Sequence, residues 1–472
     1  MRDLRTNSLA GELLIALDRA GSVPMHRQVE AAIRDNIRSG RLRLGTALPA
    51  TRTLAADLGV SRGVVVEAYQ QLVAEGYLTS RAGGYTQVAI GPGPAPAPAP
   101  AEPAPAPRID FGYGRADTVH FPRAAWLRSA RRVLTETPHE RFGYLSGHGM
   151  PELRAALADY LNRVRGTAAE PANVLICNGY AQGIALLIQV LAKSGAKRLA
   201  VEDPSADDDC RPAAASAGLE LVGIPVDDGG IRVDALERSD ADAVILTPSH
   251  QWPTGAVLSA EARAAVLRWA TRRGTLIVED DYDAEYRYDR APVGAMQGLA
   301  PDHVVYAGTA SKTLAPGLRL GWLVVPPRLV DGVVAAKVLA DRGSPALDQL
   351  VFADFLSRGE FDRHLRRMRP MYRRRRDALL HALREHLPEL RPAGIAAGLH
   401  LVTRLPPDLD EAAVVAAAAL RGVGVHGVTP YRIGNAGDGG LIFGYATLSE
   451  RTIREGIGLL AAAIVEVRSG RR

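Results

Sequence analysis

Lys312 is the residue of this sequence with the clearest chemical potential. A lysine ε-amine is a nucleophile that condenses with a carbonyl group to form a Schiff base. It lies in VVYAGTASKTLAPGLRLGWLVVP, where a Ser/Thr cluster comes just before it and Arg319 follows seven residues later. Asp280 ends the apolar run TLIVED, 32 residues before Lys312, and Tyr282 comes two residues after that carboxylate. An amine, a guanidinium, a carboxylate and a phenol therefore all stand close to the ends of apolar segments.

These four side chains match the needs of a pyridoxal phosphate site. Such a site uses a lysine for the Schiff base, phosphate ligands nearby and a carboxylate that faces the pyridine nitrogen. A serine–lysine pair alone carries little information, because most lysines lie on the surface. The acidic triplet at 279–281 would by itself also fit a solvated loop, but it directly follows an apolar run. We predict that Asp280 pairs with a protonated pyridine nitrogen and that Tyr282 reaches the phenolic oxygen of the ring.

The part of the chain that contains these residues, 108–472, alternates apolar runs with helical stretches. The runs VLICNG, RLAVED, AVILTP, TLIVEDD and HVVYAGT are typical of buried strands, with helices such as AEARAAVLRWATRRG between them. This alternation predicts an α/β fold with a largely parallel sheet. Polar clusters follow these runs, at the strand ends where ligands bind in open α/β sheets. The tail from about residue 360 is helix-rich, with strands predicted near GLHLVTRL and GLIFGYA, which indicates a smaller C-terminal α+β subdomain.

A Pro/Ala-rich linker, residues 91–107, separates this part from residues 1–90. Its sequence, GPGPAPAPAPAEPAPAP, favours extended polyproline II at ~3.1 Å per residue, a reach of roughly 50 Å. The preceding module is predicted to contain three helices and a hairpin. The first helix has Val29, Ile33 and Ile37 on one face and ends at Gly40; the second covers Arg52 to Leu58 and is closed by Gly59; the third is capped by Ser61 and runs to Gly76.

This layout is that of a winged helix-turn-helix, in which a recognition helix enters the major groove of DNA. Residues 1–90 contain eleven Arg, no Lys and eight Asp or Glu, a net charge of +3. That excess suits a polyanionic partner, but it is equally typical of a solvated surface. Three helices and a hairpin also form protein-interaction modules, so layout and charge alone leave both alternatives open.

Composition excludes several classes of protein. Hydrophobic residues make up 47% and charged residues 23% of the 472 residues, as in ordinary soluble domains. No apolar run approaches the ~20 residues that span a bilayer, so no membrane partner is expected. The N-terminus lacks the pattern of a signal peptide. Cys177 and Cys210 form neither a disulfide framework nor a metal-ligand spacing. We expect a cytoplasmic protein without a metal site.

The segment LPATRTLAADLGVSRGVVVEAYQQLVAEGYL resembles the DNA-binding module of the GntR family over some 30 residues. The resemblance implies that Arg52 and Arg62 contact phosphates or bases of a double-stranded operator, and that Arg81 belongs to the wing with Gly83 and Gly84. Ser61 would both cap the third helix and touch a phosphate. Val66 lies where some relatives have a further contacting Arg, so the operator sequence does not transfer.

The chain from about Tyr113 onward resembles fold-type I aminotransferases, and specifically the MocR subgroup that fuses such a domain to a GntR module. The resemblance lies in YLSGHGMPELRAAL, VEDP, TPSHQWPTG, VEDDYDAEYRYD and GTASKTLAPGLRLGWLV. It implies that Lys312 forms the Schiff base, with Asp280 and Tyr282 in the roles given above. It also implies that the phosphate is bound by Thr309, Arg319 and backbone groups around Gly179, Tyr180 and Ala181. Tyr144 would reach the phosphate of the neighbouring subunit, which implies a homodimer.

Two departures from the family weaken an enzymatic interpretation. Relatives have a Tyr near the cofactor ring where this chain has Ala206, so that contact is lost unless Trp252 or Tyr180 replaces it. Aminotransferases also place an Arg close to the strand GLIFGYA to bind the substrate carboxylate. Here Arg432 is the nearest candidate. We assign no chemistry to His250, which belongs to the same predicted cleft.

The leading hypothesis is a transcription regulator whose aminotransferase-like domain binds pyridoxal phosphate, with or without an amino-acid effector. The lost carboxylate contact favours the vitamin itself as effector, similar to the pyridoxine-biosynthesis regulators of the subgroup. Two alternatives stay open: an active aminotransferase with an accessory DNA module, and a scaffold with a decayed cofactor site. The Arg-rich stretch at 364–383 is interpreted as a long solvated helix, with a second DNA-facing surface as the alternative.

Overall fold

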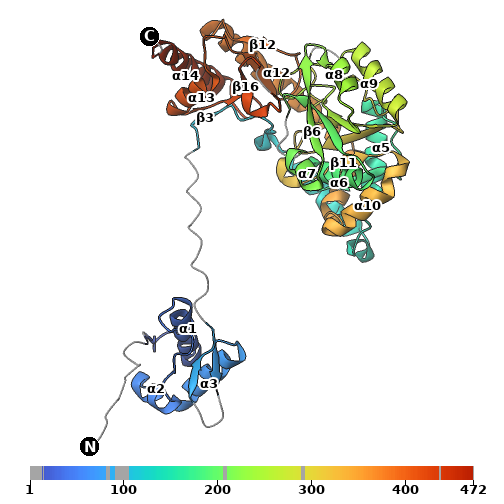
Figure 1. Ribbon diagram of the computed structural model, residues 1–472. Helices are drawn as coiled ribbons and strands as arrows, with labels where there is room; N and C mark the ends of the chain where they lie inside the picture. The colour runs from blue at the N-terminus through green and yellow to red at the C-terminus, as the bar shows by residue number, and fades with distance from the viewer. Residues whose placement is uncertain are drawn as a thin grey trace, which may run out of the picture. The chain divides into compact units, whose positions relative to one another are not determined.

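The chain forms two compact units, Met1–Ala104 and Pro105–Arg472. The computed structural model describes residue 13 and residues 15–80, 85–90, 106–205, 210–288, 293–434 and 437–470. Arg81, Ala206 and most of the predicted linker therefore lie outside the described residues. Figure 1 shows the elements of each unit. The two units are described in turn.

The N-terminal unit has the three helices and the hairpin that the sequence predicts. Its elements are α1 (Met25–Arg38), α2 (Thr51–Leu58), α3 (Arg62–Ala74), β1 (Leu78–Ser80) and β2 (Thr86–Val88). Val29, Ile33 and Ile37 are fully buried on one face of α1, where they pack with residues of α2, α3 and both strands. The two strands pair antiparallel, with Leu78 opposite Val88. A winged helix-turn-helix is therefore present.

One glycine and one serine set helix ends in this unit. Gly59 follows α2 in the left-handed conformation, with a φ of 62°, which residues with a Cβ rarely adopt. Ser61 precedes α3 in an extended conformation, but its side chain makes no capping hydrogen bond. The prediction that Ser61 is the N-cap residue of α3 is therefore confirmed, whereas the predicted capping by its hydroxyl is wrong.

The C-terminal unit is built on an eight-stranded mixed sheet. Its strand order is β4-β11-β10-β9-β8-β5-β6-β7. Neighbours from β10 to β6 pair parallel, whereas β11 runs antiparallel to both β10 and β4. The strands are β4 (Val174–Cys177), β5 (Arg198–Asp203), β6 (Glu220–Asp227), β7 (Gly230–Ile231), β8 (Ala243–Leu246), β9 (Leu276–Asp281), β10 (Val304–Thr309) and β11 (Gly321–Val324).

Helices cover both faces of this sheet, as Figure 1 shows. The helices of this part are α4 (Arg123–Glu136), α5 (Pro151–Arg165), α6 (Tyr180–Lys193), α7 (Cys210–Ala217), α8 (Val233–Arg238), α9 (Ala260–Arg273), α10 (Pro327–Asp341) and α11 (Ala346–Ser357). Alternate residues of one strand enter different cores: Leu175 and Cys177 pack toward α6, whereas Val174 and Ile176 pack toward α5. Burial on both faces explains why the strands appear in the sequence as continuous apolar runs.

The last part of the chain forms the smaller α+β subdomain that the sequence predicts. Its four-stranded sheet has the order β12-β13-β16-β15. The elements are α12 (Glu360–His386), β12 (Arg391–Ala393), β13 (His400–Arg404), α13 (Glu411–Leu420), β14 (Val423–Gly424), β15 (His426–Gly427), β16 (Gly440–Gly444) and α14 (Glu450–Ser469). The strand β3 (Ile109–Asp110), which follows the predicted linker, pairs with β14.

The Arg-rich stretch is one long helix, α12, but it is not solvated all round. Leu365, Met368, Tyr372, Leu379 and Leu383 are buried along it. The arginines occupy the remaining faces. Because they lie between the apolar residues in the sequence, the helical spacing of the apolar residues, about 3.6 positions, was overlooked. None of the helices that the structure describes has the length and apolar character that a bilayer span needs.

Ile33→Ala tests whether the two units fold independently. It removes a fully buried side chain from α1, so we expect the free energy of unfolding of the N-terminal unit to fall by about 2–5 kcal/mol. All four Trp residues belong to the C-terminal unit, so Trp fluorescence follows that unit alone. In urea, circular dichroism should show an earlier transition while the fluorescence transition stays in place. Val23→Ala, at a 53% exposed position, is the control and should change neither transition. If the fluorescence transition of Ile33→Ala moved together with the circular dichroism transition, the two units would not fold independently.

Candidate functional site

The parallel strands of the large sheet bring the predicted cofactor residues to one edge. Asp203 and Asp281 end β5 and β9, Thr309 ends β10, and Lys312 follows three residues later. Because β5, β8, β9 and β10 run parallel, their carboxyl ends meet on the same side. The sheet topology therefore explains how residues more than 100 positions apart converge.

Lys312 is partly buried, and its Nζ donates a hydrogen bond to the carbonyl oxygen of Gly114 at 2.7 Å. The positive charge of this amine lies close enough to Asp280 to lower the pKa of that carboxyl group. Burial and the neighbouring Asp281 act in the opposite direction and keep the pKa of Asp280 well above its usual range. A second cation near Asp280, such as a protonated pyridine nitrogen, would therefore favour its ionised form.

Asp281, next to Asp280, points into the protein core. Its Oδ2 accepts hydrogen bonds from Arg165 Nε at 2.7 Å and from the Tyr306 hydroxyl at 2.7 Å. Arg165 also donates to the carbonyl of Val293 and the hydroxyl of Ser249. Both members of the ion pair are buried, with side-chain exposures of 0% and 2%. The end of β9, which carries Asp280, is therefore held by a buried ionic network.

Tyr282 lies beside His250. Its hydroxyl donates to the His250 carbonyl at 2.8 Å, and the same oxygen is 3.2 Å from His250 Nδ1. Burial, followed by the charges of Asp283, Asp280 and Glu202, raises the pKa of Tyr282 well above its usual range. The phenol therefore stays protonated and can serve as a hydrogen-bond donor.

Arg319 and the start of α6 form a cradle suited to a phosphate. Gly179 precedes α6 with a φ of 84°, and a Cβ at this position would lie 2.6 Å from Arg319 Nη2. Arg319 donates to the carbonyl of Asn178 at 2.7 Å. The N–H groups of Tyr180 and Ala181 belong to the first turn of a 14-residue helix, whose N-terminus attracts anions. A glycine, a guanidinium and a helix N-terminus therefore lie together, and such groups attract anions.

Thr309 is buried, and its hydroxyl contacts Ser311 Oγ at 3.0 Å and the Leu320 carbonyl at 3.3 Å. It thus belongs to the turn that carries Lys312. Tyr144 differs from the other predicted residues: its side chain is 97% exposed, before α5. It does not join the site of its own chain, which is consistent with a role toward a second subunit but does not test it.

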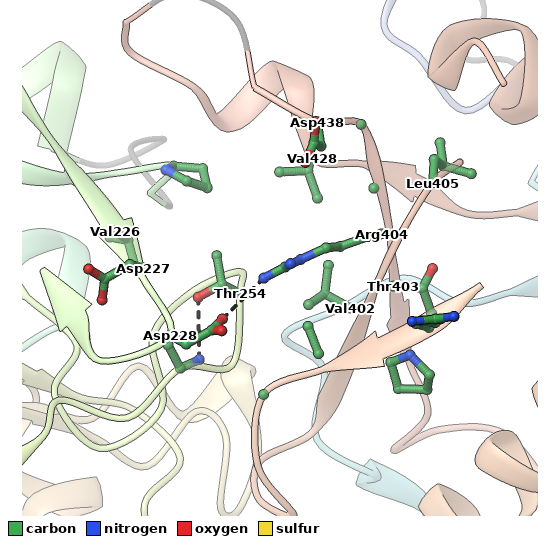
Figure 2. Close-up of a pocket in the computed structure, with 18 of the residues that line it drawn as sticks. Val226, Asp227, Asp228, Thr254, Val402, Thr403, Arg404, Leu405, Val428 and Asp438 are labelled. Atoms are coloured by element: carbon green, nitrogen blue, oxygen red, sulfur yellow. Dashed lines mark hydrogen bonds and ion pairs between the residues drawn. The ribbon is translucent and has the colours of Figure 1, made fainter. Parts of the chain in front are cut away.

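Arg432 lines a separate cleft of about 1190 Å³ between the large sheet and the C-terminal subdomain. Its Nη2 donates to the carbonyl of Asp438 at 2.9 Å. Figure 2 shows Arg404 crossing this cleft toward Asp228, with which it forms an ion pair of 3.1 Å. Asp203 also lines this cleft, and its carboxylate accepts hydrogen bonds from the backbone N–H groups of Ile433 and Gly434.

Sequence reasoning named Trp252 as a candidate ring neighbour of the cofactor but missed Tyr431 and Glu202. The Trp252 and Tyr113 rings lie 4.2 Å apart, and the Tyr113 hydroxyl is 2.5 Å from that of Tyr431. Trp252 is thus packed between protein rings. Glu202 is buried and accepts hydrogen bonds from the backbone N and the hydroxyl of Thr247. The motif VEDP contained Glu202, but only burial distinguishes it from a surface acid.

In the N-terminal unit, the predicted DNA contacts Arg52, Ser61 and Arg62 are all exposed. Arg52 lies in the first turn of α2, Ser61 immediately precedes α3, and Arg62 is its first residue. In the helix-turn-helix geometry the N-terminal residues of the recognition helix contact DNA. The two positions at the start of α3 fit that requirement.

Glu202→Gln should stabilise the protein above pH 7. Burial raises the pKa of Glu202 to about 7, whereas an unfolded glutamate titrates near ~4.3. The folded state therefore binds this proton more tightly, and the associated stability is present below pH ~4 and is lost as the pH rises to about 7. Glutamine keeps an acceptor for Thr247, so we expect the variant to be more stable by about 3–4 kcal/mol at pH 8 and similar to the parent at pH 4.

Urea denaturation at several pH values measures this difference. The exposed Glu136→Gln serves as the control and should give the parent's profile. A stability difference that does not change with pH would contradict the assigned titration of Glu202.

Comparison with known proteins gives a consistent result for both units. The family model described as "Bacterial regulatory proteins, gntR family" matches residues 25–88, and "Aminotransferase class I and II" matches residues 108–458. The probable rhizopine catabolism regulatory protein MocR of Rhizobium meliloti is 36% identical, over 97% of both chains. The pyridoxine biosynthesis transcriptional regulator PdxR of Corynebacterium glutamicum is 31% identical, over 94% of this chain and 97% of the relative.

Solved structures support the fold of the C-terminal unit. The α-aminoadipate aminotransferase of Thermus thermophilus, in complex with N-(5'-phosphopyridoxyl)-L-leucine, has a TM-score of 0.69 and 28% identity. The match covers 76% of this chain and 93% of that structure. The predicted fold-type I aminotransferase architecture is therefore confirmed. A GntR helix-turn-helix precedes an aminotransferase class I and II domain in this chain, and regulators of the MocR type match it along nearly their whole length. The chain therefore belongs to the MocR-type transcriptional regulators.

Proposed function

We propose that this regulator binds pyridoxal phosphate at Lys312 and that the bound cofactor controls its binding to a double-stranded DNA operator. The observation that carries the proposal is the meeting of Lys312, Asp280, Tyr282 and the Arg319–Gly179 cradle at one edge of the sheet. When bound, the cofactor supplies an aldehyde that condenses with an amine. The residues present fit it: a buried carboxylate for the ring nitrogen, a protonated phenol for the ring oxygen, and an anion cradle for the phosphate.

The segment that follows the predicted linker contacts this site, which supports the coupling of cofactor binding to the DNA-binding unit. β3 pairs with β14 of the C-terminal subdomain, and four residues after β3 the carbonyl of Gly114 accepts the Lys312 ammonium. Gly114 has a φ of 69°, and a Cβ there would lie 2.9 Å from Lys312 Nζ. We therefore expect a change at the lysine nitrogen to act on the segment that leads to the linker.

We propose a homodimer in the cytoplasm as the working form, since the regulator acts on DNA. An exposed Tyr144 is suited to completing the phosphate site of a second subunit. Exposed apolar residues on nearby elements, Phe142 in the 3₁₀ turn His139–Phe142 and Leu339 on α10, are 44% and 84% exposed. Such apolar surface is typical of protein–protein contacts.

An active aminotransferase with an accessory DNA module is the second candidate. The similarity of the C-terminal unit to an aminotransferase favours it. Against it, Arg432 is bound to the Asp438 carbonyl within the separate cleft. Multiple turnover of amino acids and keto acids at enzyme-like rates by the purified protein would support the enzyme, whereas cofactor-dependent operator binding without turnover supports the regulator.

Arg62→Ala tests the DNA interface. We expect operator binding to weaken by about 1–3 kcal/mol if Arg62 contacts a base, and the slope of log K against log salt to fall by about 0.9 if it contacts a phosphate. Gel-shift titrations at several salt concentrations measure both quantities. Arg238→Ala removes the same charge from an exposed position on α8 of the other unit and should leave operator binding unchanged. Unchanged affinity and slope in Arg62→Ala would remove this residue from the interface.

Lys312→Ala tests the cofactor site. We expect the variant to lose the covalent bond to pyridoxal phosphate, seen as loss of the cofactor absorbance after gel filtration, because no other lysine occupies that position. Its DNA-binding unit should stay folded and bind operator, but without a response to the cofactor. The exposed Lys193→Ala on α6 is the control. Complete loss of operator binding in Lys312→Ala, with unchanged dimerisation, would contradict the independence of the two units.

A further inference from the structure

Two histidines and one aspartate form a buried cluster next to Tyr282. His250, Asp283 and His400 are 3%, 1% and 3% exposed. They come from three parts of the chain: the loop after β8, the loop after β9, and the start of β13. The cofactor-binding roles proposed above use none of the three, so their presence beside the phenol needs its own explanation.

His250 contacts both Asp283 and Tyr282 through hydrogen-bonding groups. His250 Nδ1 lies 3.1 Å from Asp283 Oδ2. A carboxylate only accepts hydrogen bonds, so Nδ1 carries the proton and donates. The Tyr282 hydroxyl donates to the His250 carbonyl at 2.8 Å, and its oxygen lies 3.2 Å from the same Nδ1–H. Residue 250 therefore contacts the phenol oxygen at two points.

Close packing fixes the His250 ring. The His400 ring lies 4.7 Å from it, and His400 Nε2 bonds the Pro253 carbonyl at 3.2 Å. Gly398, with a φ of 71°, backs the pair: a Cβ there would lie 2.2 Å from His250 Cε1 and 2.4 Å from Asp283 Oδ2. The imidazole and the carboxylate thus have little room to change their relative positions.

The charged groups around the phenol are mostly acidic. Asp280, Asp281 and Asp283 follow from β9 into its loop, and Glu202 faces the phenol from β5. Burial, with smaller effects of His250 and Lys312, lowers the pKa of His400 well below its usual range, so this ring is neutral. A neutral His400 and a protonated Tyr282 let the cluster act through hydrogen bonds.

We propose that His250 and Asp283 are positioning residues that hold the Tyr282 oxygen in place, so that its hydrogen, which is on the His250 carbonyl in this structure, can turn to the phenolic oxygen of the cofactor when the cofactor binds. Asp283 fixes the His250 tautomer with the proton on Nδ1. That N–H contacts the Tyr282 oxygen and makes the phenol a stronger donor, because hydrogen bonds in a chain polarise one another. The inference rests on the proposed function, since it concerns the same cofactor site.

The same three side chains bring donor atoms within 4.8 Å of one another, a spacing that a metal ion could also use. One nitrogen of each ring already has a hydrogen-bond partner without a metal ion: His250 bonds Asp283, and His400 bonds the Pro253 carbonyl. Metal analysis of the purified protein is therefore part of the test. A divalent metal bound in a 1:1 ratio, and lost in His400→Phe, would overturn the proposal.

The experiment compares full-length variants that differ in this network. Asp283→Asn keeps the shape of the side chain, and the double variant His250→Phe/Asp283→Asn removes the N–H without leaving a lone buried carboxylate. Tyr282→Phe removes the donor itself and serves as the reference. Asp117→Asn is the matched control, because Asp117 and His120 form another Asp–His pair, 2.9 Å apart, beside η2 (Thr118–His120). Thermal melting first establishes that each variant is folded.

Two quantities are measured by absorbance: the Kd of pyridoxal phosphate and the pH midpoint of the cofactor band. We expect about 3–10-fold weaker binding in Asp283→Asn and about 10-fold in the double variant, as for a weakened or lost hydrogen bond. The midpoint should move to higher pH in both, toward that of Tyr282→Phe, because a weaker donor stabilises the ionised phenolic oxygen less. Asp117→Asn should give the values of the parent protein.

The outcomes separate this inference from the proposed function. If the parent protein binds no pyridoxal phosphate, the proposed function itself fails. If the parent binds it and Tyr282→Phe shifts the midpoint, but Asp283→Asn and the double variant do not, the proposed function stands and the positioning role is disproved.

Discussion

The buried ion pair between Arg165 and Asp281 is the constraint on which the cofactor site depends. Although burial alone would lower the pKa of Arg165, the charge of Asp281 raises it above its usual range, so the guanidinium stays ionised in the core. Successive side chains of a strand point to opposite faces. With the Asp281 side chain bound to Arg165, Asp280 projects to the other side, where the charge of Lys312 acts on it. Removing one partner of such a pair typically costs about 3–5 kcal/mol, so the register at the end of β9 is strongly determined.

The predicted cofactor site contains more buried carboxyl groups than cationic side chains. Glu202, Asp280 and Asp283 all act on Tyr282, and burial raises the pKa of both Glu202 and Asp280. Burying carboxylates together is unfavourable unless a cation offsets them. The Lys312 ammonium supplies one positive charge, and a protonated pyridine ring would supply another. A further cation would therefore stabilise the ionised carboxylates of this site.

Most of the fold was predictable because each predicted element has a local signal. The face of α1 appears as apolar residues at helical spacing, and Gly59 marks the end of α2. The strands of the large sheet appear as apolar runs because both of their faces are buried. The apolar face of α12 was missed because arginines occupy the positions between its buried residues.

The environment of the site was less accessible to sequence reasoning. His250 and its partner Asp283 both lie in motifs that the sequence analysis quotes. The contact between the His250 and His400 rings, in contrast, joins residues 150 positions apart. Spacing along the chain carries no information about such contacts. The predicted capping hydrogen bond of the Ser61 hydroxyl is absent for a related reason. The residue type suits a cap, but whether the side chain turns toward the helix depends on local geometry. Lys312, Asp280 and Tyr282 could be singled out because short motifs and strand ends place them together.

The strand that could carry a carboxylate-binding arginine has no space for one at its first residue. A Cβ on Gly440 would lie 2.8 Å from the Thr403 carbonyl and 2.9 Å from the Val428 side chain. The nearby guanidinium groups have contacts of their own: Arg432 donates to the Asp438 carbonyl, and Arg404 forms an exposed ion pair with Asp228. A catalyst must bind its substrate in attack geometry, whereas a sensor needs only different affinities of a ligand for two states. The absence of a carboxylate-binding guanidinium would therefore hinder transamination more than sensing.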